Sequence, residues 1–201
     1  MTIQFVVPPS SLRWIGAAPV DRPVVVLIRH SVRPPLPPVG SDFDLPLTNE
    51  GVALARELGG HLSSRLRSLH ASPLTRCMQT AEAIREGAAS SLQVHPDRLL
   101  GHPGAFVLDG SLARVTWERL GHEAVMDNLV RDVPPLEGLA HAQPAARYLV
   151  HHMLAAAAND RGVHMFVTHD SLVSAAAAQL LRVPIQSDEW PWYLEAACFW
   201  C

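Results

Sequence analysis

Lysine is absent from this sequence of 201 residues, and all 16 of its basic residues are arginine. A Walker A phosphate loop and Schiff-base chemistry both need a lysine amine, so the sequence excludes them, together with pyridoxal phosphate as a cofactor. Arginine stays charged in proteins, and its planar guanidinium suits phosphate. Genome base composition can also account for a chain that uses arginine alone.

Cysteine is scarce, and long apolar runs are missing. Cys198 and Cys201 have the C-x-x-C spacing, but the βαβ context and the second cysteine pair of a redox or zinc site are absent. We therefore expect a reduced, cytoplasmic protein with no metal and no cofactor. No stretch approaches the ~20 apolar residues of a membrane span, and residues 1–20 do not resemble a signal peptide. The net charge of -3 gives no reason to expect nucleic acid or a membrane as a partner.

Strand and helix patterns alternate along the chain. Short apolar runs predict strands at 24–28, 69–72, 92–95, 163–168 and 193–199, and helical spacing predicts helices after Thr48 and at 75–86, 140–158 and 171–181. This alternation predicts a single domain over residues 1–201, an α/β fold built as a three-layer α/β/α sandwich around a mostly parallel sheet.

Two segments depart from the alternation. Residues 1–22 are expected to be irregular because prolines interrupt them, and prolines also force the chain after residue 33 into an extended loop. Residues 96–140 are rich in Gly, Pro and His and carry two weak helical patterns, at 111–120 and 124–131. We expect this segment to be an insertion that caps the active site, where specificity is often decided.

Charged side chains directly follow two of the predicted strands. Arg29 and His30 follow the first strand, and His169 and Asp170 follow the strand that ends at Thr168. Ligands of open α/β sheets bind outside the carboxyl ends of the strands, so we expect these residues in one crevice.

Two further arginines belong to the same expectation. Arg76 falls in the first turn of a predicted helix, where free N–H groups and the helix dipole favour an anion. Arg33 lies four residues after Arg29 and can fold back over the site. These residues predict a phosphate-binding site around a histidine.

The motifs at these positions resemble those of the histidine phosphatase superfamily, which includes the phosphoglycerate mutases. The sequence SPLTRCMQTA at Ser72–Ala81 is similar to the family's Ser-x-Leu-x-Arg-x-x-Gln-Thr-Ala, Arg29-His30-Ser31 to its Arg-His-Gly, and LTNEG at 47–51 to its Leu-Thr-x-x-Gly. The resemblance covers residues 24–88 and 163–181, and it implies a phosphoglycerate mutase-like fold.

The family has two branches that differ in the source of the catalytic proton. The acid-phosphatase and phytase branch has Arg-His-Gly-x-Arg-x-Pro and a His-Asp pair whose Asp donates the proton. The sequence RHSVRPP at 29–35 fits that pattern except at Ser31, and His169-Asp170 fits it fully. The mutase-like branch takes its donor from a Glu in the middle segment. The chain has no room for the helical domain of acid phosphatases, so we interpret it as a compact enzyme with acid-phosphatase-like RHxxRxP and HD motifs.

The resemblance implies a role for each matched residue. His30 would be the nucleophile, Asp170 the proton donor, and Arg29, Arg33, Arg76 and His169 the phosphate-binding residues, with Ser31 either crowding the site or donating a hydrogen bond to the phosphate. Asp97, Asp109 and Glu118 are alternative proton donors, and Asp170 could simply cap its helix.

The predicted function is that of a metal-independent phosphomonoesterase acting through a phosphohistidine on a small organic phosphate ester. A mutase-like phosphotransferase and a catalytically weak relative that binds phospho-ligands are the alternatives. Trp117, Trp190 and Trp192 could line a pocket for an organic substrate or pack in the core. The sequence leaves the oligomeric state open, a dimer being one option.

Overall fold

The computed structural model describes residues 5–36, 43–131, 133–157, 160–183 and 185–200. The helices are α1 (Pro9–Ala17), α2 (Asn49–Leu62), α3 (Thr75–Gly87), α4 (Gly110–Val130), α5 (Ala142–Ala157) and α6 (Asp170–Leu181), with short 3-10 helices η1 (Ser63–Arg65), η2 (Arg98–Leu100) and η3 (Ser187–Glu189); the strands are β1 (Pro23–Arg29), β2 (Leu66–Ala71), β3 (Val94–Pro96), β4 (Gly162–Thr168) and β5 (Ala196–Phe199). Pro37, Pro38 and Cys201, which the sequence interpretation used, lie outside the described residues.

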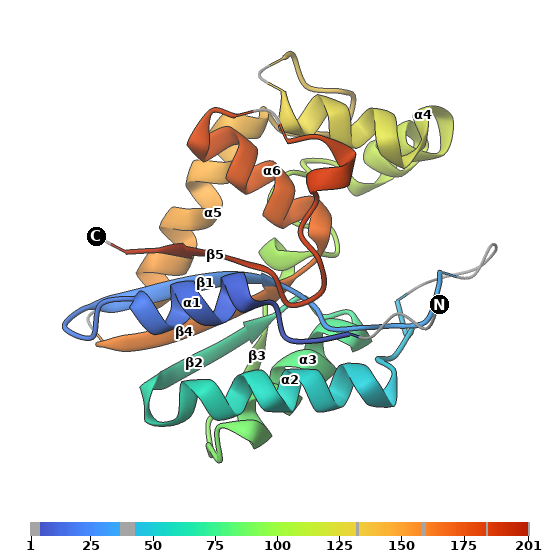
Figure 1. Ribbon diagram of the computed structural model, residues 1–201. Coiled ribbons are helices and arrows are strands. Elements are labelled where there is room, and N and C mark those ends of the chain that lie inside the picture. The colour runs from blue at the N-terminus through green and yellow to red at the C-terminus, as the bar shows by residue number, and fades with distance from the viewer. Residues whose placement is uncertain (1–4, 37–42, 132, 158–159, 184, 201) are drawn as a thin grey trace.

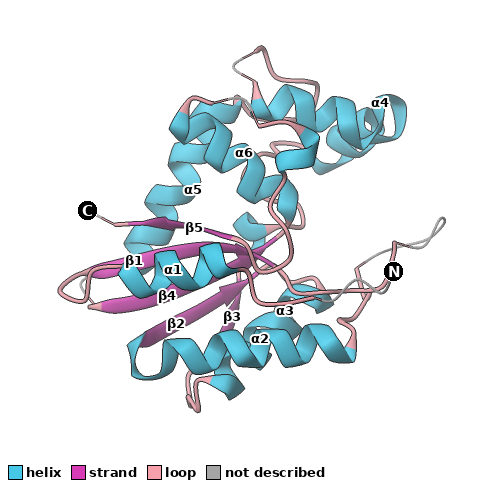
Figure 2. Cartoon of the chain, in the orientation of Figure 1, coloured by secondary structure: helices cyan, strands magenta, loops and turns pink. Residues whose placement is uncertain are grey.

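The strands form one sheet in the order β3-β2-β4-β1-β5 (Figure 2). Strand β1 pairs in parallel with β4 along its whole length, from Pro23 opposite Gly162 to Arg29 opposite Thr168. Strands β2 and β3 are also parallel, and β5 alone is antiparallel. The mostly parallel sheet of the prediction is confirmed, and β1 and β4 end side by side.

Helices cover both faces of the sheet, which makes three layers (Figure 1). Alternate residues of β1 supply the two cores, because successive strand side chains point to opposite faces. Val26 packs into a core with α1, α2 and α3, and Leu27 packs into a second core with α4, α5 and α6. Both faces of β1 are buried, which explains its continuous apolar sequence.

Helix α2 starts where its capping residue predicts. The Thr48 side chain accepts a hydrogen bond from the Gly51 N–H at 3.0 Å. Gly51 also permits a close approach of the loop after β1, because a Cβ at this position would lie 2.1 Å from the Val32 carbonyl oxygen. The helix therefore holds the loop that carries His30.

Two predictions at the ends of the chain are wrong. Residues 1–22 are not wholly irregular, because α1 begins at Pro9, and a proline is tolerated in the first turn of a helix, where its missing N–H would have no partner. Strand β5 begins at Ala196 and not at Tyr193, because Leu194 has a positive φ of 62° and the Glu195 N–H closes a turn on the Trp192 carbonyl.

Residues 96–140, the middle segment, agree more closely with the helical patterns in their sequence. The two predicted helical stretches are the halves of α4, which Gly121 divides with non-helical angles of φ 80° and ψ 166°. Within the part of the chain that the structure describes, no helix is long and apolar enough to cross a membrane.

Candidate functional site

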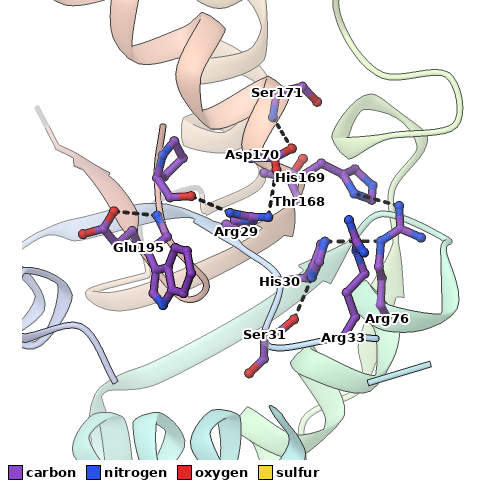
Figure 3. A network of polar contacts seen from close by, with 12 residues as sticks. Arg29, His30, Ser31, Arg33, Arg76, Thr168, His169, Asp170, Ser171 and Glu195 are labelled. Carbon is purple, nitrogen blue, oxygen red and sulfur yellow. Dashed lines mark hydrogen bonds and ion pairs between the residues drawn. The ribbon is translucent and has the colours of Figure 1, made fainter. Parts of the chain in front are cut away.

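The site lies where β1 and β4 end. The His30 N–H donates to the Thr168 carbonyl at 2.8 Å, which continues the pairing of the two strands by one residue. His30 and His169 therefore follow adjacent strands, and their ring centroids are 5.6 Å apart. Figure 3 shows both rings beside Arg76, which comes from the start of α3. The structure therefore brings His30 and His169 together where the strands end, as the sequence predicted.

The His30 ring is held with its Nε2 towards Arg76. Its Nδ1 lies 2.8 Å from the Ser31 carbonyl oxygen, which can only accept, so Nδ1 carries the proton. Its Nε2 accepts a hydrogen bond from Arg76 Nε at 3.2 Å. Burial lowers the pKa of His30 well below its usual range, and the charges of His169, Arg76 and Arg29 lower it further. His30 is therefore a neutral imidazole near pH 7, with the lone pair of Nε2 directed at a cation.

Arg76 links the two histidines. The side chain is buried, its Nε contacts His30, and its Nη2 lies 3.4 Å from His169 Nδ1 (Figure 3). His169 Nε2 lies 3.1 Å from Ser72 Oγ, at the end of β2. Three strand ends and one helix start thus supply the residues around His30.

Arg29 is held on the other side of the network. Its guanidinium forms an ion pair with Asp170 at 2.9 Å (Figure 3). It also donates to the Pro191 carbonyl at 2.7 Å and lies 4.3 Å from the centre of the Tyr193 ring. Burial lowers the pKa of Arg29, and the nearby Asp170 carboxylate acts in the opposite direction. The structure therefore brings Arg29 and Asp170 together, while the charge of Arg29 still acts on His30.

The side chains of Arg33 and Ser31 have different hydrogen-bond partners. In Figure 3 the Arg33 guanidinium points towards His30 and Arg76. Its Nη1 donates a hydrogen bond to the Pro34 carbonyl at 2.8 Å. The Ser31 hydroxyl donates to the Gly51 carbonyl at 2.7 Å. The hydroxyl proton of Ser31 is therefore used within the fold, and the serine fastens its loop to α2.

The alternative acids in the middle segment have other partners. Asp97 lies 2.7 Å from His152 Nε2 and caps η2, Asp109 caps α4, and Glu118 is an exposed residue that pairs with Arg114. Of the four acidic residues considered from the sequence, Asp170 is the one that contacts a residue of the phosphate-binding set.

Sequence reasoning missed two residues that position the site. Thr80 Oγ1 accepts a hydrogen bond from the Ser31 N–H at 3.0 Å and donates to the Arg76 carbonyl at 2.7 Å. Gln79 Oε1 accepts from the Leu47 N–H at 2.8 Å. Both residues belong to the SPLTRCMQTA motif, and a polar pair one helical turn after Arg76 was the available signal. The motif therefore ties α3 to the loops that carry the site.

A cavity of about 340 Å³ adjoins Arg76 and His169. It is lined by Leu74, Arg76, Gly101, His102, Pro103, Gly104, Phe106, Val107, Trp117, Leu129, His169, Ser171 and Leu172. Most of its wall comes from the middle segment. Of the three tryptophans considered, Trp117 lines this cavity, whereas Trp192 stacks on Phe5 and Trp190 contacts His122.

Comparison with known proteins gives one family. The model of the histidine phosphatase superfamily (branch 1) matches residues 25–198. No curated protein matches the chain significantly.

Solved structures share the fold. They include a phosphoglycerate mutase from Bacillus anthracis (18% identity, 89% of this chain and 88% of that chain, TM-score 0.57). They also include a phosphoserine phosphatase mutant from Entamoeba histolytica in complex with phosphoserine (17%, 81% and 81%, 0.54) and a mycobacterial glucosyl-3-phosphoglycerate phosphatase (22%, 81% and 81%, 0.53). The phosphoglycerate mutase-like fold is confirmed. The acid-phosphatase-like assignment of the two motifs stays a prediction, because neither the family match nor the shared fold tests these motifs.

Proposed function

Because the chain belongs to the histidine phosphatase superfamily, we propose that it is a phosphoric monoester hydrolase with His30 as its nucleophile. The observation that carries the proposal is the state of His30. This imidazole is neutral, its Nδ1 proton is held by the Ser31 carbonyl, and its Nε2 lies beside Arg76. A nucleophilic histidine needs an unprotonated nitrogen with a lone pair and a cation near the group it attacks.

The reaction has two displacements. Nε2 of His30 attacks phosphorus, the bond from phosphorus to the ester oxygen breaks, and the leaving oxygen takes a proton. Water then attacks the phosphohistidine, the N–P bond breaks, and inorganic phosphate leaves. Positioning and charge stabilisation supply most of the catalysis in such transfers. The proposal needs no metal ion, since Arg29, Arg33, Arg76 and His169 provide positive charge and hydrogen-bond donors.

Two buried donors support an anion at this place. The Nε atoms of Arg29 and Arg33 are buried and have no hydrogen-bond partner among the described residues. Buried polar groups without partners are uncommon and call for an explanation. A phosphate would supply the acceptor oxygens.

Asp170 is our proposed proton carrier. Its carboxylate accepts hydrogen bonds from Arg29 and from the Ser171 N–H. In the proposed first displacement the Asp170 carboxyl gives a proton to the leaving oxygen. The resulting carboxylate then accepts a proton from the attacking water.

The test is phosphate release from p-nitrophenyl phosphate in excess EDTA. The wild type should be active, and His30→Ala should lose activity almost completely, whereas the exposed His151→Ala on α5 should remain unchanged. Acid labile, base stable phosphate should be trapped on the wild type and not on His30→Ala. Full activity of His30→Ala would refute the proposal.

The same samples separate the alternatives. A mutase-like enzyme would pass its phosphoryl group to an added phosphoglycerate in preference to water. A ligand-binding relative would bind vanadate without releasing phosphate.

A further inference from the structure

We infer that the cavity beside Arg76 and His169 receives the organic part of the substrate and selects an uncharged, apolar group the size of one aromatic ring. The inference rests on the proposed function and adds a substrate class to it. Arg76 and His169 line this cavity and also surround His30. An ester whose phosphate lies at His30 can therefore extend its alcohol into the cavity.

The wall away from the phosphate-binding residues is apolar. Its large apolar side chains are those of Leu74, Phe106, Val107, Trp117, Leu129 and Leu172, from the residue before α3, the middle segment and α6. Burial of apolar surface contributes roughly 25 cal/mol per Å². A hydrocarbon group thus gains binding energy on this wall, whereas a hydroxyl or a carboxylate placed against it loses water without a replacement partner.

Charge in the cavity is limited. Among the described residues that line it, the ionisable side chains are Arg76, His169 and His102. The first two belong to the phosphate-binding set, and the His102 ring contacts Phe43 at a centroid distance of 4.8 Å. Apart from the phosphate-binding residues, the described lining contains one ionisable side chain, His102, and no arginine. A second negative group on the substrate would therefore have only His102 as a partner.

The size and the shape of the cavity also fit a small apolar group. Its volume of about 340 Å³ is at the lower end of the range for ligand pockets. The Trp117 N–H donates to His122 Nδ1 at 3.3 Å, so its polar atom is already used and the indole carbons remain for the ligand. At Gly101 a Cβ would lie 2.7 Å from His169 Nε2, so the absence of a side chain there keeps room where the cavity meets the phosphate-binding residues.

The test compares esters of primary alcohols, so that the leaving groups have similar chemistry. Benzyl phosphate and hexyl phosphate are measured against 3-phosphoglycerate and phosphoserine. We expect kcat/KM for the apolar esters to exceed that for the charged esters at least ~10-fold, which is the lower end of the discrimination that one methylene group provides in an apolar pocket. Equal or higher kcat/KM for the charged esters would overturn the inference, while their hydrolysis by His30 would leave the proposed function standing.

Variants locate the preference in the cavity. Trp117→Ala should lower kcat/KM for benzyl phosphate roughly 10-fold and leave methyl phosphate, which is too small to reach the wall, unchanged. Trp14→Ala removes an exposed tryptophan of α1 and should change neither. Trp117→Arg should shift the ratio towards 3-phosphoglycerate.

The two failures are distinguishable. If Trp117→Ala does not fold, the ratio for the wild type decides alone. An unchanged ratio in folded Trp117→Ala and Trp117→Arg would overturn the inference. The absence of phosphate release from every ester, p-nitrophenyl phosphate included, would overturn the proposed function and the inference with it.

Discussion

At the scale of the residue, the ion pair between Arg29 and Asp170 is central to the proposed chemistry. The pair joins the end of β1 to the first residue of α6 at 2.9 Å. Asp170 is not the N-cap predicted from the sequence, because α6 begins at Asp170 and His169 holds the N-cap position. Its carboxylate still accepts from the Ser171 N–H, so it can serve the start of the helix and no more. The leaving group of the substrate separates this structural role from proton transfer.

We predict that Asp170→Asn loses activity unevenly. A general acid contributes about 10²–10⁴-fold, and an alkoxide needs the proton far more than p-nitrophenolate does. Hydrolysis of an alkyl phosphate should therefore fall by about that factor, and hydrolysis of p-nitrophenyl phosphate by much less. The measurement is kcat for both esters.

Asp97→Asn is the matched control. This residue pairs with His152 and caps η2, so its replacement should affect stability and leave the ratio of the two rates unchanged. An equal loss on both esters in Asp170→Asn, or a leaving-group effect in Asp97→Asn, would contradict the assignment.

Single residues could be predicted from the sequence where their position follows from a strand end. His30 and His169 were placed together because adjacent parallel strands end at the same edge. The partners of Arg29 could not be predicted, because Pro191 lies 162 positions away in the chain and its carbonyl carries no sequence signal. The hydrogen bond of Ser31 to the Gly51 carbonyl could not be predicted either, because a backbone carbonyl carries no sequence signal.

At the scale of the element, β2 carries a histidine whose surroundings oppose protonation. The His70 ring stacks on Phe166 of β4 with centroids 4.6 Å apart, and the His95 ring of β3 lies 5.5 Å away. Burial lowers the pKa of His70 to about 4, with the charge of His95 as the next cause. The folded protein therefore takes up this proton less readily than the unfolded chain does.

The consequence is a predicted loss of stability in weak acid. Unfolding takes up a proton at His70 between the unfolded pKa of about 6.5 and the folded value of about 4, so the free energy of unfolding falls as the pH falls through that window. In urea titrations at several pH values, His70→Gln should show a shallower fall than the wild type. His61→Gln, an exposed position on α2, should follow the wild type. Parallel curves for the wild type and His70→Gln would refute this.

Helices and strands with a regular spacing of apolar residues could be predicted from the sequence. Elements whose start depends on local backbone geometry could not. Strands β1, β2 and β4 and helices α2, α3, α5 and α6 begin within a few residues of the predicted positions. Helix α1 was missed because Pro9 is read as a breaker until its place at the first position of the helix is known. The start of β5 depends on the positive φ of Leu194, which a leucine does not indicate.

At the scale of the whole molecule, the two cores share one sheet. Leu58 of α2 lies in one core and Leu149 of α5 in the other, and both side chains are fully buried. Because β1 contributes to both cores, loss of packing on either face weakens the same strand.

We therefore predict a single unfolding transition for both core variants. Leu58→Ala and Leu149→Ala should each lower the free energy of unfolding by about 2–5 kcal/mol. Far-ultraviolet circular dichroism and tryptophan fluorescence should give coincident urea curves for each variant. Leu108→Ala, at a position that is 79% exposed, should have little effect. Separate transitions for the two probes would show that the layers unfold independently.

The order of the strands also determines how long β1 stays without partners during the synthesis of the chain. Strand β1 leaves the ribosome early, but both of its neighbours, β4 and β5, are encoded far downstream. Pro191, whose carbonyl accepts from Arg29, follows Arg29 by 162 residues. Synthesis of that stretch takes roughly 8–32 seconds at about 5–20 residues per second. During that time β1 has none of its partners in the sheet, and its apolar side chains are unpaired. An apolar segment that stays exposed in this way is prone to aggregation until β4 and β5 have been made.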